Sequence, residues 1–267
     1  MPGSVIISSA RTPIGKVSGG LGSFTAMDLG GFAIKAALER AGIPADQVAY
    51  VIMGQVLQGG QGQITARQAA AKAGIPMSVP AMTLNKVCLS GINALYTADQ
   101  MIQAGDADVV VAGGMESMTR APYLLPGARA GYRMGNAELI DSMIHDGLWC
   151  AFDAVHMGAG TEKYSAQYSI DRKAQDELAA QSHERAAAAA KAGRLAEEIV
   201  PVEVPQRKGD PIVVDSDEGI RPGTTPESLG NLKPAFSKDG TITAGNASQI
   251  SDGAAAKIGR ASCRERV

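Results

Sequence analysis

The sequence is poor in the residues that build disulfides and metal sites. Its 267 residues include three cysteines and three histidines, and aromatic residues make up only 4% of the chain. The cysteines, Cys88, Cys150 and Cys263, are widely spaced and form no CxxC pair, so neither a disulfide framework nor a structural zinc site is expected. The histidines lack the i, i+4 spacing that places two ligands on one helical face, and we assign no metal.

An excess of positive charge is also missing. Lys and Arg number 25 against 27 Asp and Glu, which gives a net charge of -2 and no broad cationic surface for nucleic acid. No apolar run reaches the roughly 18 residues that a membrane-spanning helix needs. The first residues, MPGSVIISSARTP, lack the pattern of a secretory signal. We therefore expect no nucleic-acid or membrane partner and a cytoplasmic location.

The first 114 residues alternate short apolar runs with segments of helical period. Strands are expected at 4–8, 48–56, 79–87 and 108–114, and helices at 27–40, 64–72 and 90–103. Such alternation is typical of a largely parallel sheet covered by helices. The predicted fold class is therefore α/β.

The pattern changes in the second part of the chain. Residues 115–160 are rich in Met, Gly, Pro and Tyr without a steady period, which indicates loops and short helices. A long helix is expected over 171–192, with Ser169 or Asp171 as its N-cap. The stretch 197–219 predicts two extended segments joined by a Gly-Asp turn.

Cys88 occupies an unusual place in the segment NKVCLSGINAL. It follows a β-like run and comes just before the predicted helix that starts near Ser90. The N-terminal end of a helix carries partial positive charge, which favours an anion such as a thiolate. A free cysteine is more often a small buried apolar residue. Position alone therefore leaves both a nucleophile and a packing residue open.

Three other features have ordinary interpretations. The glycine-rich GGQGQ at 59–63 follows a predicted strand but lacks the GxGxxG spacing of a dinucleotide site. Asp215, Asp217 and Glu218 form an acidic cluster that we interpret as a solvated turn. Cys150 is interpreted as a packing residue.

Six segments occur in an order that is far more specific than any one of them alone. They are SSARTPIGK (8–16), NKVCLSGINAL (85–95), VVVAGGMESMT (109–119), HMG (156–158), LKPAFSKDGTITAGNAS (232–248) and SDGAAA (251–256). By these segments the chain resembles the thiolase family, in particular its biosynthetic acetyl-CoA acetyltransferase branch. The resemblance extends over residues 4 to about 257.

The resemblance implies a domain organisation. Residues 1–118 correspond to the first part of the family's βαβαβαβ N-terminal domain, 119–244 to an inserted loop domain, and 245–257 to the return to the first domain. The family's second α/β half, which carries a GHP histidine and a CxG cysteine, is expected to be missing. An apolar strand is expected after SDGAAA, but the last ten residues, 258–267, are expected not to continue it. They are expected to be a non-native tail that resembles sequencing-adapter read-through, in which Cys263 has no function.

The resemblance also implies a reaction. Cys88 would accept the acetyl group of one acetyl-CoA, and a second acetyl-CoA would attack the acetyl-enzyme to give acetoacetyl-CoA and CoA, with thiolysis as the reverse. Coenzyme A thioesters are then substrates, and no cofactor is expected. Because the family's proton-transferring histidine and second cysteine are not encoded, we expect the fragment itself to be inactive.

The same resemblance implies where coenzyme A binds. Leu148, His156 and Met157 would lie beside the pantetheine arm, and Arg221 would contact the nucleotide end. Further lining positions are Ser228, Ala235, Phe236, Ala244 and Ser248. Without the resemblance, His156 would be interpreted as a packed loop histidine and Arg221 as a solvated charge. The loop within 115–134 would contribute to a homo-oligomer, a dimer or tetramer, of the full-length protein.

Two alternatives stay open. One is a degradative 3-ketoacyl-CoA thiolase of broader chain length, although the HMG segment favours the biosynthetic branch because its methionine crowds the acyl pocket. The other is a non-catalytic acyl-CoA or lipid-binding thiolase-like protein. Such a protein would normally lack the nucleophile, whereas Cys88 is present.

Overall fold

The chain is divided into two compact units in the computed structural model, which describes residues 3–262. The first unit contains the chain through Pro122, the segment Ala196–Glu218, and the chain from Ser251 onward; the second contains Tyr123–Leu195 and Gly219–Ile250. Each unit is described in its own right below. The domain ranges that the family resemblance implies stay a prediction, and Cys263 lies outside the described residues.

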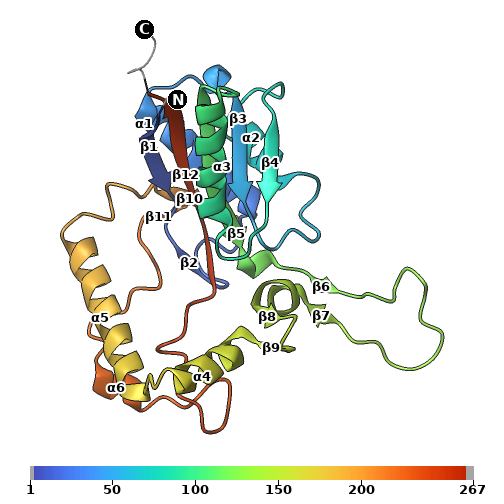
Figure 1. The fold of residues 1–267 in the computed structure, drawn as a ribbon, viewed down its shortest axis with the longest axis vertical. Coiled ribbons are helices and arrows are strands. Elements are labelled where there is room, and N and C mark those ends of the chain that lie inside the picture. Colours follow the sequence, from blue (N-terminus) through green and yellow to red (C-terminus); the bar gives the residue numbers. More distant parts are fainter. Residues whose placement is uncertain (1–2, 263–267) are drawn as a thin grey trace. The chain divides into compact units, whose positions relative to one another are not determined.

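A mixed sheet forms the centre of the first unit (Figure 1). Its strands lie in the order β1-β12-β5-β3-β4, and their bounds are β1 Ser4–Arg11, β3 Tyr50–Gly54, β4 Ala81–Leu84, β5 Val109–Ser117 and β12 Ser251–Ala261, with the short β2 (Gly15–Lys16) paired to β12. β3 is parallel to β4 and to β5, whereas β12 is antiparallel to β1 and β5. The predicted α/β class is confirmed, with one strand running against the rest.

Helices cover both faces of this sheet. α1 (Ala26–Ala41) and α2 (Thr65–Lys72) pack on one side, and α3 (Ser90–Ala104) packs on the other (Figure 1). All three helices begin and end within one residue of the predicted bounds. The apolar stripe of α1 is buried, including Leu29, Ala33 and Ala37. Short 3-10 turns lie at Ala45–Gln47 and Met118–Arg120.

The last strand extends further than the sequence indicated. We expected the apolar strand to stop before residue 258, but β12 continues to Ala261 and pairs with both β1 and β5. Ile258 is fully buried within the core on the α1 side. The expectation was wrong for residues 258–261 because an apolar side chain at Ile258 and two partner strands sustain the ladder through the polar residues around it.

A segment from the middle of the chain is part of the first unit. The two extended segments predicted there are β10 (Val202–Val204) and β11 (Ile212–Val214), which pair in antiparallel direction. The segment is attached to β1, because the Arg11 amide donates to the Glu198 carbonyl at 3.0 Å and the Val200 amide donates to the Arg11 carbonyl at 2.8 Å.

The second unit contains short strands and three α-helices. β6 (Tyr123–Leu124) pairs with β7 (Ile140–Asp141), and β8 (Trp149–Cys150) pairs with β9 (Val155–His156), with a π-helix at Met143–Leu148. The helices are α4 Met157–Gln167, α5 Arg172–Lys191 and α6 Pro226–Gly230. Of the two candidate caps of α5, Asp171 is the one used, accepting from the Ala174 amide at 2.8 Å. Across the residues that the structure describes, no helix has both the length and the apolar character needed to cross a membrane.

The first turn of α3 packs directly on the end of β3. A Cβ atom built on Gly54, the last residue of β3, would lie 2.5 Å from the Ser90 carbonyl carbon and 2.6 Å from the Ser90 Cβ. Both atoms belong to or are attached to the backbone of α3, so they cannot move aside as the end of a flexible side chain could. The absence of a side chain at Gly54 therefore sets how closely the helix approaches the strand.

We predict that Gly54→Ala lowers the free energy of unfolding by about 1–3 kcal/mol, because the new methyl group overpacks this contact. Gly59→Ala is the matched control, since a Cβ there meets no atom within 4 Å. Urea unfolding of both variants measures the difference. Equal stability of the two variants would contradict the close packing.

Candidate active site

Cys88 lies between the end of β4 and the start of α3, where the sequence predicted it. The residue is exposed, so it is not a packing residue of the core. Val87, directly before it, has a φ of 50°, a left-handed conformation that is unusual for a β-branched residue. The chain therefore turns sharply at the cysteine and presents the sulfur at the surface of the unit.

The turn is closed by Ser90. Its hydroxyl donates to the Val87 carbonyl at 2.6 Å and accepts from the Lys86 amide at 2.8 Å. Asn85 also contributes, because its side-chain oxygen accepts from the Val87 amide at 2.9 Å. Side chains on either side of Cys88 thus hold the backbone that carries it.

A cavity of about 290 Å³ lies beside this turn at the carboxyl ends of β3 and β5. Val87 and Ser90, the neighbours of Cys88, line it together with Gln55, Glu116 and Arg11. Crevices at the carboxyl ends of parallel strands are the usual ligand sites of α/β sheets. The exposed thiol and this cavity make the region the candidate active site.

Glu116 is a mostly buried carboxylate in this cavity that the sequence analysis did not single out. It accepts from the Val56 amide at 2.8 Å and from the Leu57 amide at 3.3 Å. Burial, with a smaller contribution from Asp252, raises the pKa of Glu116 against these hydrogen bonds. Only its place in the quoted VVVAGGMESMT segment could have drawn attention to it.

Gln55 adds a second buried polar group. The side chain is 2% exposed and its amide nitrogen donates to the Leu57 carbonyl at 3.2 Å. Its side-chain oxygen has no hydrogen-bond partner among the described residues. A buried side-chain oxygen without a hydrogen-bond partner is uncommon in proteins.

The interpretation of the acidic cluster as a solvated turn was wrong for two of its three members. Asp217 binds the Arg11 guanidinium through both oxygens, at 2.7 and 2.9 Å, and accepts from the Ile14 amide. Glu218 accepts from the amides of Lys16 and Gly20. Asp215 alone is exposed. Opposite charge and unpaired loop amides, which lie about 200 residues away in the sequence, draw the two carboxylates inward.

The second unit brings two of the predicted coenzyme A residues together. The His156 and Phe236 rings stack with their centroids 4.9 Å apart. His156 also caps α4, where its Nδ1 accepts from the Gly158 amide at 3.1 Å. A Cβ on Gly158 would lie 2.3 Å from the Phe236 ring, so the glycine of the HMG segment makes room for this stack.

The remaining predicted residues lie on loops and helix ends of the same unit. Ala235 and Ala244 flank a paired segment, because Pro234 and Thr243 form a bridge and the Ala235 amide donates to the Ile242 carbonyl. Leu148 ends the π-helix, Met157 begins α4, Ser228 belongs to the capping box of α6, and Arg221 and Ser248 are exposed. The Arg221 amide donates to His183 Nδ1 at 3.3 Å. Cys88 is in the first unit, and these nine residues are in the second.

Two carboxylates that sequence reasoning missed hold these loops in place. Glu162 accepts from the amides of Thr241 and Ile242 at 2.8 to 2.9 Å. Asp176, which is buried, binds Arg172 at 2.7 Å and accepts from the Asn246 side chain at 2.9 Å. Arg172 lies one helical turn before Asp176. Thr241, Ile242 and Asn246 lie 70 to 80 residues away from the carboxylates that bind them, which no local pattern could reveal.

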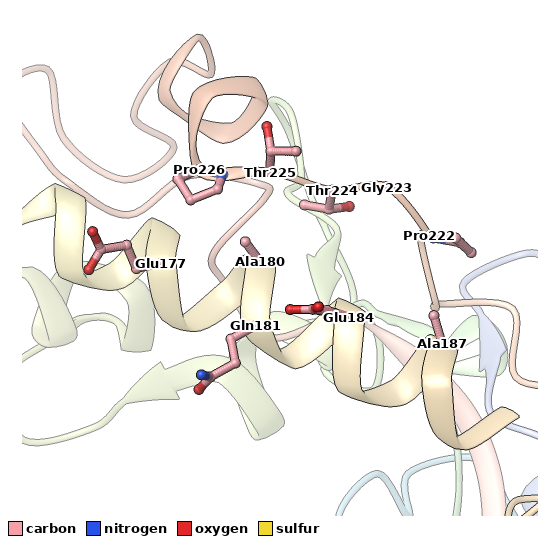
Figure 2. Close-up of a pocket in the computed structure, with 10 residues that line it drawn as sticks. All are labelled: Glu177, Ala180, Gln181, Glu184, Ala187, Pro222, Gly223, Thr224, Thr225 and Pro226. Carbon is pink, nitrogen blue, oxygen red and sulfur yellow. The ribbon is translucent and has the colours of Figure 1, made fainter. Parts of the chain in front are cut away.

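The second unit also contains a larger cavity of about 520 Å³ (Figure 2). One face of α5 lines it with Glu177 and Glu184, and the turn Pro222–Pro226 lines the opposite side. Its lining includes two carboxylates and no cationic side chain, so it is a poor place for the phosphates of a nucleotide. Within residues 3–262, no three His, Cys, Asp or Glu side chains gather where they could hold a metal ion.

Comparison with known proteins shows the family of the chain. The sequence profile described as "Thiolase, N-terminal domain" matches residues 4–259. The chain belongs to the thiolase family. The predicted resemblance is therefore confirmed, and the exposed Cys88 turn belongs to a thiolase N-terminal domain.

Individual relatives give the same result. An "Acetyl-CoA acetyltransferase" of Cupriavidus necator is 56% identical over 254 residues, and one of Pseudomonas aeruginosa is 54% identical; each match covers 95% of this chain and 65% of the relative. A "Probable acetyl-CoA acetyltransferase" of Mycolicibacterium smegmatis is 59% identical over 95% of this chain and 66% of its own length. The thiolase chain thus spans slightly less than two thirds of the relatives it matches.

We predict that Asp217→Asn lowers the free energy of unfolding by about 1–3 kcal/mol at neutral pH, because it removes a charge-assisted pair with Arg11. Partial burial opposes ionisation of Asp217, but the bonds from Arg11 and the Ile14 amide outweigh it and lower its pKa. Ionised Asp217 therefore stabilises the fold above its unfolded pKa of about 3.9, and this stabilisation is lost as the pH falls through the lower folded value.

Urea unfolding at a series of pH values tests this prediction. The difference between the parent chain and Asp217→Asn should shrink on acidification. Asp215→Asn is the control, because Asp215 is exposed and should change stability little at any pH. A difference between the parent and Asp217→Asn that stays constant into strong acid would show that the charge does not contribute.

Proposed function

We propose that this chain carries the acyl-accepting half of a thiolase that transfers acetyl groups between coenzyme A thioesters. Cys88 attacks the carbonyl carbon of acetyl-CoA, a bond forms between its sulfur and the acetyl group, and the thiolate of CoA leaves. A second acetyl-CoA, deprotonated at its methyl carbon, then attacks the acetyl group. This step gives acetoacetyl-CoA and regenerates the Cys88 thiolate, and thiolysis is the reverse.

The observation that supports the proposal best is the setting of Cys88. The thiol is exposed at the end of β4, and Ser90 and Asn85 hold the turn that presents it beside the cavity. Helix α3, which begins two residues later, has no side-chain cap at its N-terminus. An uncapped helix start has amide groups that can donate to negative charge developing on a substrate oxygen.

Binding of coenzyme A is proposed for the second unit. His156 stacked on Phe236 offers an apolar ring surface for a pantetheine arm, and the small residues Ala235, Ala244 and Ser248 leave room for it. Arg221 is exposed and can contact the nucleotide end through its planar cation. Coenzyme A thioesters are substrates in this proposal, and it requires no cofactor.

Proton transfer is proposed to depend on residues outside this sequence. The family's GHP and CxG segments, which supply a histidine and a second cysteine, do not occur in residues 1–267. We therefore propose that residues 1–267 alone form the acetyl-enzyme but turn over negligibly. The homo-oligomer of the full-length protein rests on the same resemblance, whereas the cytoplasmic location is proposed from the sequence pattern alone.

We predict that acetyl-CoA acetylates Cys88 of the purified chain. Tryptic mass spectrometry after incubation should locate the acetyl group on the peptide that contains Cys88, as a thioester that hydroxylamine removes. Cys88→Ala should abolish this modification, and Cys150→Ala should leave it unchanged. Acetylation that persists in Cys88→Ala would contradict the assignment of Cys88 as the nucleophile. The absence of acetylation in the parent chain would also contradict it.

A series of acyl-CoA thioesters separates the biosynthetic proposal from a degradative thiolase. We predict that hexanoyl-CoA acylates Cys88 at least about tenfold more slowly than acetyl-CoA, because the family resemblance implies that the methionine of the HMG segment, Met157, crowds the acyl chain. Met157→Ala should reduce the difference between the acylation rates with acetyl-CoA and with hexanoyl-CoA. Similar rates for all chain lengths would favour the degradative reading, and binding of acyl-CoA without acylation would favour a non-catalytic protein.

A further inference from the structure

The left-handed backbone at Val87 is held at its carbonyl by Ser90 and at its amide by a second side chain, Asn85. Val87 is 43% exposed, so packing of its own side chain does not hold it in place. Its amide is held by the Asn85 side-chain oxygen at 2.9 Å, and Asn85 is itself exposed. A positive φ persists at a β-branched residue only where the surroundings determine it strongly.

Asn85 is anchored to the loop that follows β3. Its side-chain nitrogen donates to the Val56 carbonyl at 3.3 Å. The Asn85 amide group thus joins two backbones, with its nitrogen bound to the β3 loop and its oxygen bound to the residue before Cys88. If the β3 loop moves, the hydrogen bond at Val87 moves with it.

The β3 loop is in turn held by Glu116. The Val56 amide donates to Glu116 at 2.8 Å, so the same peptide segment is bound at its amide by Glu116 and at its carbonyl by Asn85. The Leu57 amide donates to the same carboxylate. Gln55 and Gln58 brace the loop from within, through bonds to the carbonyls of Leu57 and Gln55.

Glu116 has no role in the proposed acyl transfer, although it lines the cavity beside the cysteine turn. Two other charged groups belong to its surroundings: Asp252, which is buried, and Arg11, which lines the same cavity and is already bound to Asp217 and Glu198. The cost of burying the Glu116 carboxylate is offset only in part, by two backbone amides rather than by a cation.

We propose that Glu116 is a positioning residue for Cys88, acting through Val56 and Asn85 on the left-handed backbone of Val87. The Glu116 carboxylate holds the β3 loop through the Val56 amide, and the Val56 carbonyl holds the Asn85 side chain. Asn85 in turn binds the Val87 amide, which precedes Cys88 and orients its thiol. The proposal rests on the proposed role of Cys88 as nucleophile, and it assigns Glu116 no contact with substrate.

Three variants of the full chain test this series of contacts from Glu116 through Val56 and Asn85 to Val87, called the relay below. Glu116→Gln weakens its first link, Asn85→Asp removes the donor to Val56 but keeps an acceptor for Val87, and Asn85→Ala removes both. Asp28→Asn is the matched control, because Asp28 is a bound carboxylate of the same unit that caps α1 and pairs with Lys72. Its loss should lower stability without affecting the cysteine turn.

Two measurements report on the turn itself. The first is amide hydrogen exchange of the peptide that covers residues 85–89, and the second is the rate constant for alkylation of Cys88 by iodoacetamide at one fixed pH. We expect Glu116→Gln to raise exchange and to lower the alkylation rate by about fivefold, the difference expected between a hydrogen bond to a charged acceptor and one to a neutral acceptor. Asp28→Asn should change neither measurement beyond its effect on global stability.

A double variant shows whether Glu116 and Asn85 act on Val87 through one series of contacts or independently of each other. In the double variant Glu116→Gln with Asn85→Ala, the effect on alkylation should be close to that of Asn85→Ala alone. Multiplicative effects, or unchanged exchange at residues 85–89 in Glu116→Gln, would overturn the proposal. If Glu116→Gln does not fold, Asn85→Asp tests the relay from its exposed end by the same two measurements.

The outcome is separable from that of the proposed function. Alkylation by iodoacetamide does not require acetyl-CoA, so the relay can be confirmed in a chain that fails to become acetylated. Conversely, acetylation of Cys88 with no sensitivity to Glu116 would support the nucleophile and reject the positioning role.

Discussion

The candidate site depends on one short hydrogen bond within the turn that carries the thiol. Ser90 Oγ donates to the Val87 carbonyl at 2.6 Å and accepts from the Lys86 amide, which ties the end of the β4 connection to the first turn of α3. Because Ser90 is buried, water does not compete for its hydroxyl. The turn can therefore keep an unfavourable φ at Val87 while Cys88 itself stays exposed.

Elements governed by local periodicity could be predicted from the sequence. The bounds of α1, α2 and α3 follow from apolar spacing, from the capping box of Thr25 and Asp28, and from glycine at the end of α1. The position of Cys88 between a strand and a helix was predictable for the same reason. The antiparallel placement of β12 was not, because the direction of a strand is decided by partners more than 100 residues away.

The polar connections of the site were the least predictable part. Asp217 and Glu218 look like a solvated turn in the sequence, yet they bind Arg11, Ile14, Lys16 and Gly20. Glu116 sits in a segment whose family resemblance was clear, but nothing in the sequence shows that Val56 and Leu57 would supply its hydrogen bonds. Pairings of this kind arise only when the sheet order brings distant loops to the same edge.

Gly54 shows how the absence of a side chain can set the geometry of a site. Because Gly54 at the end of β3 has no side chain, the backbone of the first turn of α3 packs directly against the backbone of the strand. The packing of α3 on β3 therefore sets how far the start of α3, and with it the turn that carries Cys88, lies from the sheet.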